Sequence, residues 1–558
     1  MKEISASDYQ HAKEVWDLFS CSTLLDYHTL YMELDGTLLA DIFENFRTQC
    51  LYVYGLDPVY FMTAPSLSWE ACLKKSKVKL QIITDPDINL FIDSAMIGGV
   101  SIARNPYLKA NNEMVLDYDE TKEKTWLINV DCNNQYGYSM SKYLPTGDFR
   151  WVEDPSKFMK EYILALKEDG SSGFYLEVDL EYPKHLHEEH DQYPLAPEHY
   201  TIKSSDLSEE QIKLSADLNI KIGKQTKLCL TLKKKLKYKL HYTNLQQCLK
   251  LGLVLTAVHR VLVFRQSPWM KPYIDLNTRI RQQAICKADE ELPKLMNNSC
   301  YGKTCEDVRK YSTVSIICGE DKVKKIQSKQ NSVFFERVKV YGEFSAAVLC
   351  RKKKVTLDKP RYVGAVILSI SKVVMYEFNY DWILPNFPGM KLGFTDTDSF
   401  MYLLPCETNI YSKLQELDVG RLWMDFSNYP PSHPQYSAVN HLIPGKFKDE
   451  GAGSAFSEGV FLRSKMYSIL NIKSCLNKTT AKGVTRSAKE RNLKHINYVK
   501  TVQSPAVVSK LDIHRILHSS HTLYTVKQTK SGLSAFNDKI HITKNNDEFI
   551  AHSFGYSP

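Results

Sequence analysis

Residues 391–404 constrain this chain more than any other stretch, because they set two aspartates between two apolar segments. Apolar side chains alternate with period two on both sides of Asp396 and Asp398, which predicts a hairpin with the acids at its tight turn. In extended backbone this spacing puts both carboxylates on one side. Neighbouring carboxylates repel each other and favour a cation between them, and oxygen ligands suit Mg²⁺ or Mn²⁺ rather than zinc. The alternative is an ordinary hairpin turn, where Asp is favoured by its local hydrogen bonds.

A second acidic position ends another predicted strand. Trp126, Ile128 and Val130 alternate, and Asp131 closes the strand on the opposite face. Polar residues and Tyr136 follow directly, which is not the composition of a core. The sequence therefore predicts a second carboxylate placed for metal binding.

A helical section is predicted from residue 251 to residue 302. Near its end Lys294, Asn298 and Tyr301 stand at i, i+4 and i+7, on one face that carries no aliphatic residue. A structural helix normally shows its apolar stripe there. A cation, an amide and a flat ring instead suit a triphosphate, a base edge and a stacked base. Gly302 is predicted to cap the helix.

Composition excludes several classes of protein. The 558 residues carry a net charge of +8 with clustered lysines and arginines, which is compatible with a polyanionic partner. Thirteen cysteines without a Cys-x-x-Cys pair indicate reduced thiols in an intracellular protein, not a disulfide scaffold or a zinc ribbon. No apolar signal region and no membrane span is predicted.

The order of these features predicts a reaction. Asp131 comes first, then the Lys294 helix, then the Asp396/Asp398 turn and finally Lys465-x-Tyr467. Two metal ions need carboxylates from separate strands to hold an attacking and a leaving oxygen. A cationic helix neutralises charge on a triphosphate. The predicted reaction is attack of a primer 3′-hydroxyl on an α-phosphate.

The chain resembles the family B DNA polymerases, most closely the protein-primed branch and its polymerases of Polinton/Maverick elements, small DNA viruses and organelles. The resemblance covers nearly the whole length and rests on four motifs in the family's order. The stretches similar to motifs A, B and C and to the Lys-x-Tyr motif are Asp131-Cys-Asn-Asn-Gln-Tyr-Gly137, Lys294-Leu-Met-Asn-Asn-Ser-Cys-Tyr-Gly302, Thr395-Asp-Thr-Asp-Ser399 and Lys465-Met-Tyr467.

The resemblance implies a role for each motif residue. Asp131, Asp396 and Asp398 would be catalytic, with Asp131 and Asp398 holding two Mg²⁺ (or Mn²⁺) ions. Tyr136 would pack under the incoming sugar and exclude a 2′-hydroxyl. The residues implied to bind the nucleotide beside Tyr136 are Lys294, Asn298 and Tyr301, and those implied to contact primer and DNA are Ser299, Gly302, Lys465 and Tyr467.

The implied fold is α+β, a right-hand polymerase with palm, fingers and thumb, two palm insertions and a remnant of the exonuclease domain. The predicted domains are that 3′–5′ exonuclease remnant (1–90), palm with motif A (91–160), an insertion similar to the terminal-protein region (161–250), fingers with motif B (251–305), a second insertion similar to the strand-displacement region (306–360), palm with motif C and Lys-x-Tyr (361–480), and thumb (481–558).

Three departures from the family pattern stand out. Tyr31-x-x-x-Asp35 resembles the last of three exonuclease motifs, but no Asp-x-Glu precedes it, so an amino-terminal truncation and no proofreading are expected. Met96-Ile-Gly-Gly99 lacks the Tyr or Arg usual before the glycine pair. Pro293 precedes Lys294, so either the helix begins there or it kinks.

Two functions from different classes compete. The first is a DNA-directed DNA polymerase, with primer-template DNA, deoxynucleoside triphosphates and a terminal priming protein as partners and no membrane. It would work intracellularly, in a nucleus or at a viral replication site. The alternative is a catalytically weak, transposon-derived remnant that binds DNA. A reverse transcriptase fits less well, because Asp396 and Asp398 are not adjacent.

Overall fold

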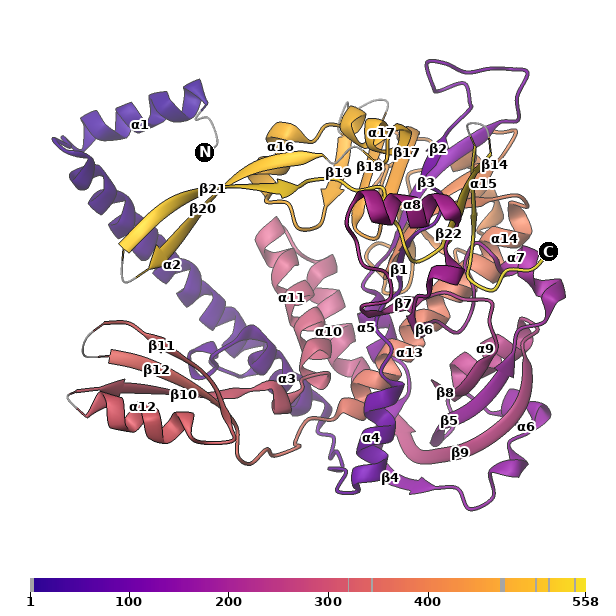
Figure 1. Ribbon diagram of the computed structural model, residues 1–558, viewed down its shortest axis with the longest axis horizontal. Coiled ribbons are helices and arrows are strands. Elements are labelled where there is room, and N and C mark those ends of the chain that lie inside the picture. The colour runs from indigo at the N-terminus through magenta and orange to yellow at the C-terminus, as the bar shows by residue number, and fades with distance from the viewer. Residues whose placement is uncertain are drawn as a thin grey trace. The chain divides into compact units, whose positions relative to one another are not determined.

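Two compact units make up the chain, residues Met1–Lys77 and Val78–Pro558. The computed structural model describes residues 5–319, 321–342, 345–471, 477–506, 509–519, 522–545 and 548–558 (Figure 1). Within these residues no helix has the length and apolar character of a membrane span.

The first unit is helical. A capping box between Thr23 and Asp26 begins the long helix α2, and Gly55 ends it in the left-handed conformation. Most of the large apolar side chains of α2 are exposed, and Cys50 is its buried residue. The elements are α1 (Ala6–Leu18), α2 (Leu24–Tyr54), the 3₁₀ helix η1 (Pro58–Tyr60) and α3 (Ala64–Ser76).

A ten-stranded sheet forms the centre of the second unit. The predicted hairpin is present, because β13 pairs antiparallel with β14, and β14 pairs in turn with β3. The main path runs β1-β13-β14-β3-β17-β18-β19, with β16 also on β3, β15 on β16 and β2 on β17. The strands are β1 (Ser101–Ala103), β2 (Tyr107–Lys109), β3 (Thr125–Cys132), β13 (Lys391–Asp396), β14 (Ser399–Pro405), β15 (Met424–Asp425), β16 (Phe447–Asp449), β17 (Phe456–Arg463), β18 (Met466–Asn471) and β19 (Asn477–Ala481).

The helix α13 (Arg361–Glu377) is buried along most of its length. It contacts the short helix α5 (Gln135–Met140) that follows β3. Its Val374 and Met375 share a hydrophobic core with Ile128 of β3 and with Leu176 of a second sheet. The helix thus joins two sheets through one core.

The second sheet overturns part of the predicted helical section. Residues 254–267 form the strand β9, not a helix, because their β-branched side chains pair along β5 on one side and β4 on the other. The helical pair begins only at α10. The sheet order is β4 (Leu144–Trp151), β9 (Val254–Ser267), β5 (Ser172–Glu181), β8 (Lys235–His241), and the helical pair is α10 (Lys271–Gln282) with α11 (Lys287–Thr304).

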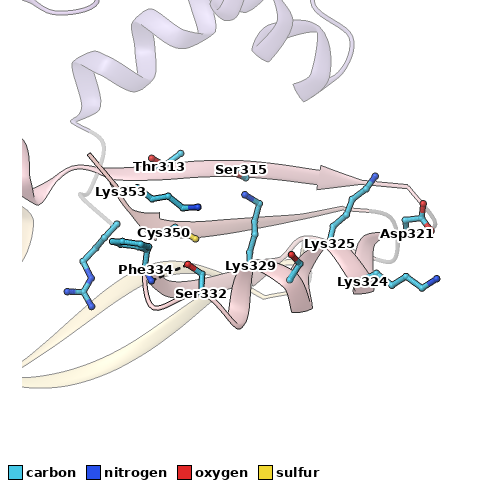
Figure 2. A pocket seen from close by; sticks show the side chains of 12 residues that line it. Thr313, Ser315, Asp321, Lys324, Lys325, Lys329, Ser332, Phe334, Cys350 and Lys353 are labelled. Carbon is cyan, nitrogen blue, oxygen red and sulfur yellow. Dashed lines mark hydrogen bonds between the residues drawn. The ribbon is translucent and has the colours of Figure 1, made fainter. Parts of the chain in front are cut away.

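Residues 308–351 build a small subdomain with a basic groove. Its strands have the order β10-β12-β11, and α12 packs beside them. A groove of about 840 Å³ lies here, and Figure 2 shows Lys325 and Lys329 extending from α12 toward β10. The elements are η5 (Val308–Lys310), β10 (Ser312–Cys318), α12 (Lys322–Gln330), β11 (Phe335–Val340) and β12 (Ser345–Arg351).

The remaining elements surround these layers. The helices are α4 (Pro86–Ala95), η2 (Pro155–Lys157), α6 (Lys160–Ala165), η3 (Lys184–Leu186), α7 (His187–His190), η4 (Ser204–Asp206), α8 (Glu209–Asp217), α9 (Tyr242–Lys250), η6 (Phe378–Ile383), α14 (Leu384–Asn386), α15 (Ile410–Leu417), α16 (Arg486–Asn492) and α17 (His495–Gln503). The strand pairs are β6 (Glu198–Thr201) with β7 (Thr226–Cys229), β20 (Lys510–Ser519) with β21 (Thr522–Ser531), and β22 (His541–Asn545) with β23 (Glu548–His552).

Candidate active site

The sheet register brings the two predicted acidic positions together. Ser399 of β14 lies opposite Asp131 of β3, and the Cys132 N–H donates to the Asp398 carbonyl at 2.7 Å. The two strands are separated by more than 250 residues of sequence. The register therefore places Asp131 and Asp398 next to each other at one end of the sheet.

The turn that carries Asp396 and Asp398 is tight and strained. Thr397 has a φ of +73°, and the Asp398 N–H donates to the Asp396 carbonyl at 2.9 Å. The Thr397 N–H donates to the Val100 carbonyl at 2.7 Å. A Cβ on Gly99 would lie 2.6 Å from the Thr397 side chain. The glycine therefore allows the loop that contains Gly99 to pack closely behind the turn.

Burial and like charge dominate the electrostatics of the pair. Burial and the neighbouring Asp398 raise the pKa of Asp131 from 3.8 to about 7. Burial, with a smaller effect of Asp396, also raises the pKa of Asp398. Asp396 instead forms an ion pair with Lys465, whose Nζ lies 3.1 Å from Oδ1. The structure thus gives the two acids of the turn different partners.

A charged group that the motif analysis missed lies beside Asp131. β16 places Lys448 opposite Asp131, and the Lys448 Nζ contacts Glu450 Oε1 at 2.7 Å. Lys478 adds a second cation 3.8 Å from Glu450. Both lysines lower the pKa of Glu450 against its burial. In the sequence, Lys448, Asp449 and Glu450 form a run of three charged residues, and this run does not predict the pairing with β3.

The carboxylates near the turn are the available ligands for the predicted metal ions. Among the described residues, no group of three or more His, Cys, Asp or Glu side chains is arranged to hold an ion. Asp131 and Asp398 provide two partly buried carboxylates whose pKa values stay raised although Lys448 and Lys478 act against the shift at Asp131 and Lys465 acts against it at Asp398. This fits Mg²⁺, which commonly takes one or two carboxylates and completes its shell with water and substrate phosphates. The residues therefore fit ions that arrive with a polyphosphate ligand.

The predicted polar face of α11 is present. Lys294 and Asn298 are exposed, while Met296 and Asn297 on the other side are buried. Lys294 contacts Glu291 at 3.6 Å, and Ser299 is buried. The face joins the Asp131 region through Tyr301, whose ring stacks on that of Tyr136 with centroids 4.0 Å apart.

Two expectations for α11 are settled by its bounds. The helix begins at Lys287 and ends at Thr304, so Pro293 lies inside it. Gly302 is not the cap, because the helix continues past it to Thr304 and Cys305 is the C-cap. Gly302 is exposed, and a Cβ there would meet nothing within 4 Å.

The Lys-x-Tyr stretch begins in the turn between two strands. β17 ends at Arg463, and β18 begins at Met466, with Lys465 at a φ of +59° between them. Lys465 can therefore reach Asp396. Tyr467 is 8% exposed and stacks on Phe394 of β13 with centroids 4.3 Å apart, so most of its ring is part of the sheet packing.

Tyr31 and Asp35 belong to the other compact unit. They lie one turn apart on α2, and both are exposed. A hydrogen bond to Asp35 raises the pKa of Tyr31. They form a local pair on a helix surface.

Replacing Asp131 by Asn is expected to stabilise the metal-free protein in a pH-dependent way. The native state holds a proton on Asp131 between pH 3.8 and about 7 that the unfolded state has lost, so this group's contribution to stability falls as pH rises through that window. The shift corresponds to at most about 4 kcal/mol. The variant should therefore melt several degrees higher than wild type at pH 8, with a smaller gain at pH 5. A melting temperature unchanged at both pH values would mean that the carboxylate is not desolvated.

The comparisons with known proteins identify the fold. No protein-family model and no curated protein matches the chain. The orthorhombic crystal form of Phi29 DNA polymerase is similar to this chain at 14% sequence identity and a TM-score of 0.51. The match covers 95% of this chain and 73% of the Phi29 polymerase chain. Its ternary complex with primer-template DNA and incoming nucleotide matches the same shares at 15% identity and a TM-score of 0.49. A family B DNA polymerase from Pyrobaculum calidifontis matches 83% and 41% at 11% identity, with a TM-score of 0.28.

The class that follows is a mixed helix and strand protein with the fold of a DNA polymerase. The likeness to the orthorhombic Phi29 structure, with its TM-score above 0.5, carries this statement. At 14% identity the likeness establishes the fold alone.

Proposed function

We propose that this chain is a DNA-directed DNA polymerase that adds deoxynucleotides to a primer 3′-hydroxyl. The observation that carries the proposal is the pair Asp131 and Asp398, which the sheet register brings together with raised pKa values at one end of a polymerase-like sheet. Repelling carboxylates in this position favour two divalent cations. When bound, such ions polarise the attacking and leaving oxygens of a phosphoryl transfer.

The remaining side chains would bind and orient the substrates. Tyr136 and Tyr301 offer a stacked platform beside the acids for the incoming sugar and base. The exposed Lys294 would neutralise the triphosphate and Asn298 would contact the nascent pair. Lys465, now paired with Asp396, would exchange that carboxylate for the primer terminus. Ser299 and Gly302 follow on the same helix as DNA contacts.

The proposal includes the family's division of the fold. The central sheet would be the palm, α10 and α11 the fingers, and residues 481–558 the thumb. The partners would be primer-template DNA, deoxynucleoside triphosphates and a terminal protein in a Polinton/Maverick-like or viral element, with replication in a nucleus or at a viral replication site. Pro293 inside α11 favours the second candidate, a catalytically weak DNA-binding remnant.

Primer extension separates the two candidates. The 558-residue protein is mixed with a primer-template duplex, the four deoxynucleotides and Mg²⁺, and products are resolved on a sequencing gel. Metal-dependent extension that EDTA abolishes supports the polymerase. DNA binding without extension in either Mg²⁺ or Mn²⁺ would support the remnant.

The basic groove is expected to contact a nucleic-acid strand. Residues 306–360 carry thirteen Lys/Arg and seven Asp/Glu, a net +6 in a chain of net +8. The groove lysines Lys324, Lys325, Lys329 and Lys353 make no ion pair within the described residues. The double change Lys325→Gln/Lys329→Gln should weaken single-stranded DNA binding. It should also reduce the salt slope, which is the steepness of log K against log salt concentration, by about 1.4, because two phosphate contacts are lost.

The control for the groove uses two exposed lysines that are already paired. Lys122 and Lys157 contact Asp119 and Asp154. Their double change to Gln removes the same charge and should leave the salt slope unchanged. Equal slopes for both double variants would show that the groove effect is one of net charge alone.

This chain is expected to extend primers without proofreading. A two-metal nuclease site needs several carboxylates, and Tyr31 with Asp35 on α2 supplies one acid and one phenol. A mismatched 3′ end should stay undigested when nucleotides are withheld. Metal-dependent 3′-to-5′ shortening of single-stranded DNA that is lost on Asp35→Ala would contradict this expectation.

A further inference from the structure

Gln135 is a buried amide next to the acidic turn. It is 3% exposed and stands at the first position of α5, directly after the left-handed Asn134. Its Nε2 donates to the Thr397 carbonyl and to the Ser371 carbonyl, both at 3.0 Å. One side chain therefore ties the turn between Asp396 and Asp398 to the core helix α13.

The turn needs such a restraint because Thr397 is held at positive φ. A residue with a Cβ in this region costs of order 1–3 kcal/mol and stays there only when its surroundings fix it. The Val100 carbonyl fixes the N–H of Thr397, and Gln135 fixes its carbonyl. The next peptide carbonyl, that of Asp398, is fixed by Cys132.

The helix α13 also anchors the other side of the turn. Lys372, the neighbour of Ser371, is buried and donates its Nζ to the Ile97 carbonyl at 2.6 Å. Ile97 precedes the Gly98-Gly99 pair, and Gly99 packs against the Thr397 side chain. One turn of α13 therefore holds both the Ile97 loop, through Lys372, and the Thr397 carbonyl, through Gln135.

We infer that Gln135 is a positioning residue that holds the turn so that the Asp398 carboxylate faces Asp131. The inference rests on the proposed polymerase function, because it assumes that the two carboxylates share divalent cations. Gln135 touches neither substrate nor ion in this role. Without the amide, the Thr397 peptide can rotate out of its strained conformation, and Asp398 then turns away from Asp131.

The test compares Gln135→Met with a matched control on a different helix. Gln246 is likewise buried at 6% exposure, and its Nε2 donates to the Ile163 and Leu166 carbonyls, both at 2.8 Å. Gln246→Met removes the same kind of amide, with two carbonyl partners, away from the acidic turn. Both variants should lose similar thermal stability, because in each of them two backbone carbonyls lose an amide donor from a buried side chain.

Only Gln135→Met is expected to weaken metal binding. Mn²⁺ binding to the complex of protein and primer-template DNA is followed by the electron paramagnetic resonance of free Mn²⁺. Gln135→Met should bind Mn²⁺ about tenfold more weakly than wild type, and Gln246→Met should match wild type. If Gln135→Met does not fold, Gln135→Asn is measured instead, since its amide is too short to span both carbonyls and should show the same loss.

The outcomes separate this inference from the proposed function. Unchanged Mn²⁺ affinity in the Gln135 variant, or an equal loss in both variants, would overturn the positioning role while wild-type binding and primer extension stand. A wild-type protein that neither binds Mn²⁺ in the DNA complex nor extends a primer would overturn the proposed function itself.

Discussion

Asp398→Asn is expected to abolish nucleotide incorporation while DNA binding survives. The change removes one of two carboxylates that would hold the metal ions, and metal stabilisation of phosphoryl transfer is worth several kcal/mol. Since each 1.4 kcal/mol is a factor of ten in rate, we expect a loss of about a thousandfold or more. Duplex affinity depends mainly on phosphate contacts elsewhere and should change little. Single-nucleotide incorporation and a gel shift at fixed salt measure the two effects.

Asp131→Asn should behave like Asp398→Asn in both assays. The control is Asp275→Asn, which removes an exposed carboxylate that pairs with Lys271 on α10. This variant should keep wild-type incorporation. If the Asp131 or Asp398 variant loses DNA binding and incorporation together, its carboxylate has a structural role. The expected gain in melting temperature of Asp131→Asn at pH 8 provides a check that the protein is folded.

Tyr136→Val is expected to raise the use of ribonucleotides relative to deoxyribonucleotides by on the order of tenfold or more. The bulk of the ring, not its hydroxyl, would exclude a 2′-hydroxyl from the incoming sugar. The stacking on Tyr301 fixes the ring in place, so the wall it forms is rigid. The measurement is the ratio of kcat/KM for a ribonucleotide and its deoxy counterpart opposite the same template base.

Two further variants separate the possible causes of sugar selection. Tyr136→Phe keeps the ring and should keep the selectivity, whereas Tyr301→Ala removes the stacking partner and should relax it partly. A sugar ratio that stays unchanged in Tyr136→Val, with activity retained, would place the selection elsewhere in the site.

Local patterns predicted the elements that carry the site. Period-two alternation located the Asp396/Asp398 hairpin and the strand that leads to Asp131. The missing aliphatic residues at Lys294 and Asn298 predicted an exposed face of α11. These predictions hold because the periods of strands and helices are properties of the backbone itself. The prediction of a helix was wrong for residues 254–267, because pairing with two neighbouring strands stabilises a strand there.

The sequence by itself determined which residues are candidates for the chemistry and the order in which they come. Tertiary structure alone decided how they are partnered: Asp398 turns to Asp131, while Asp396 turns to Lys465. It also brought Lys448 beside Asp131 and gave Gln135 its two carbonyls. These contacts join residues separated by tens to hundreds of positions. The physical reason is that they depend on the register between distant strands, which the packing of the whole core fixes and no local pattern encodes.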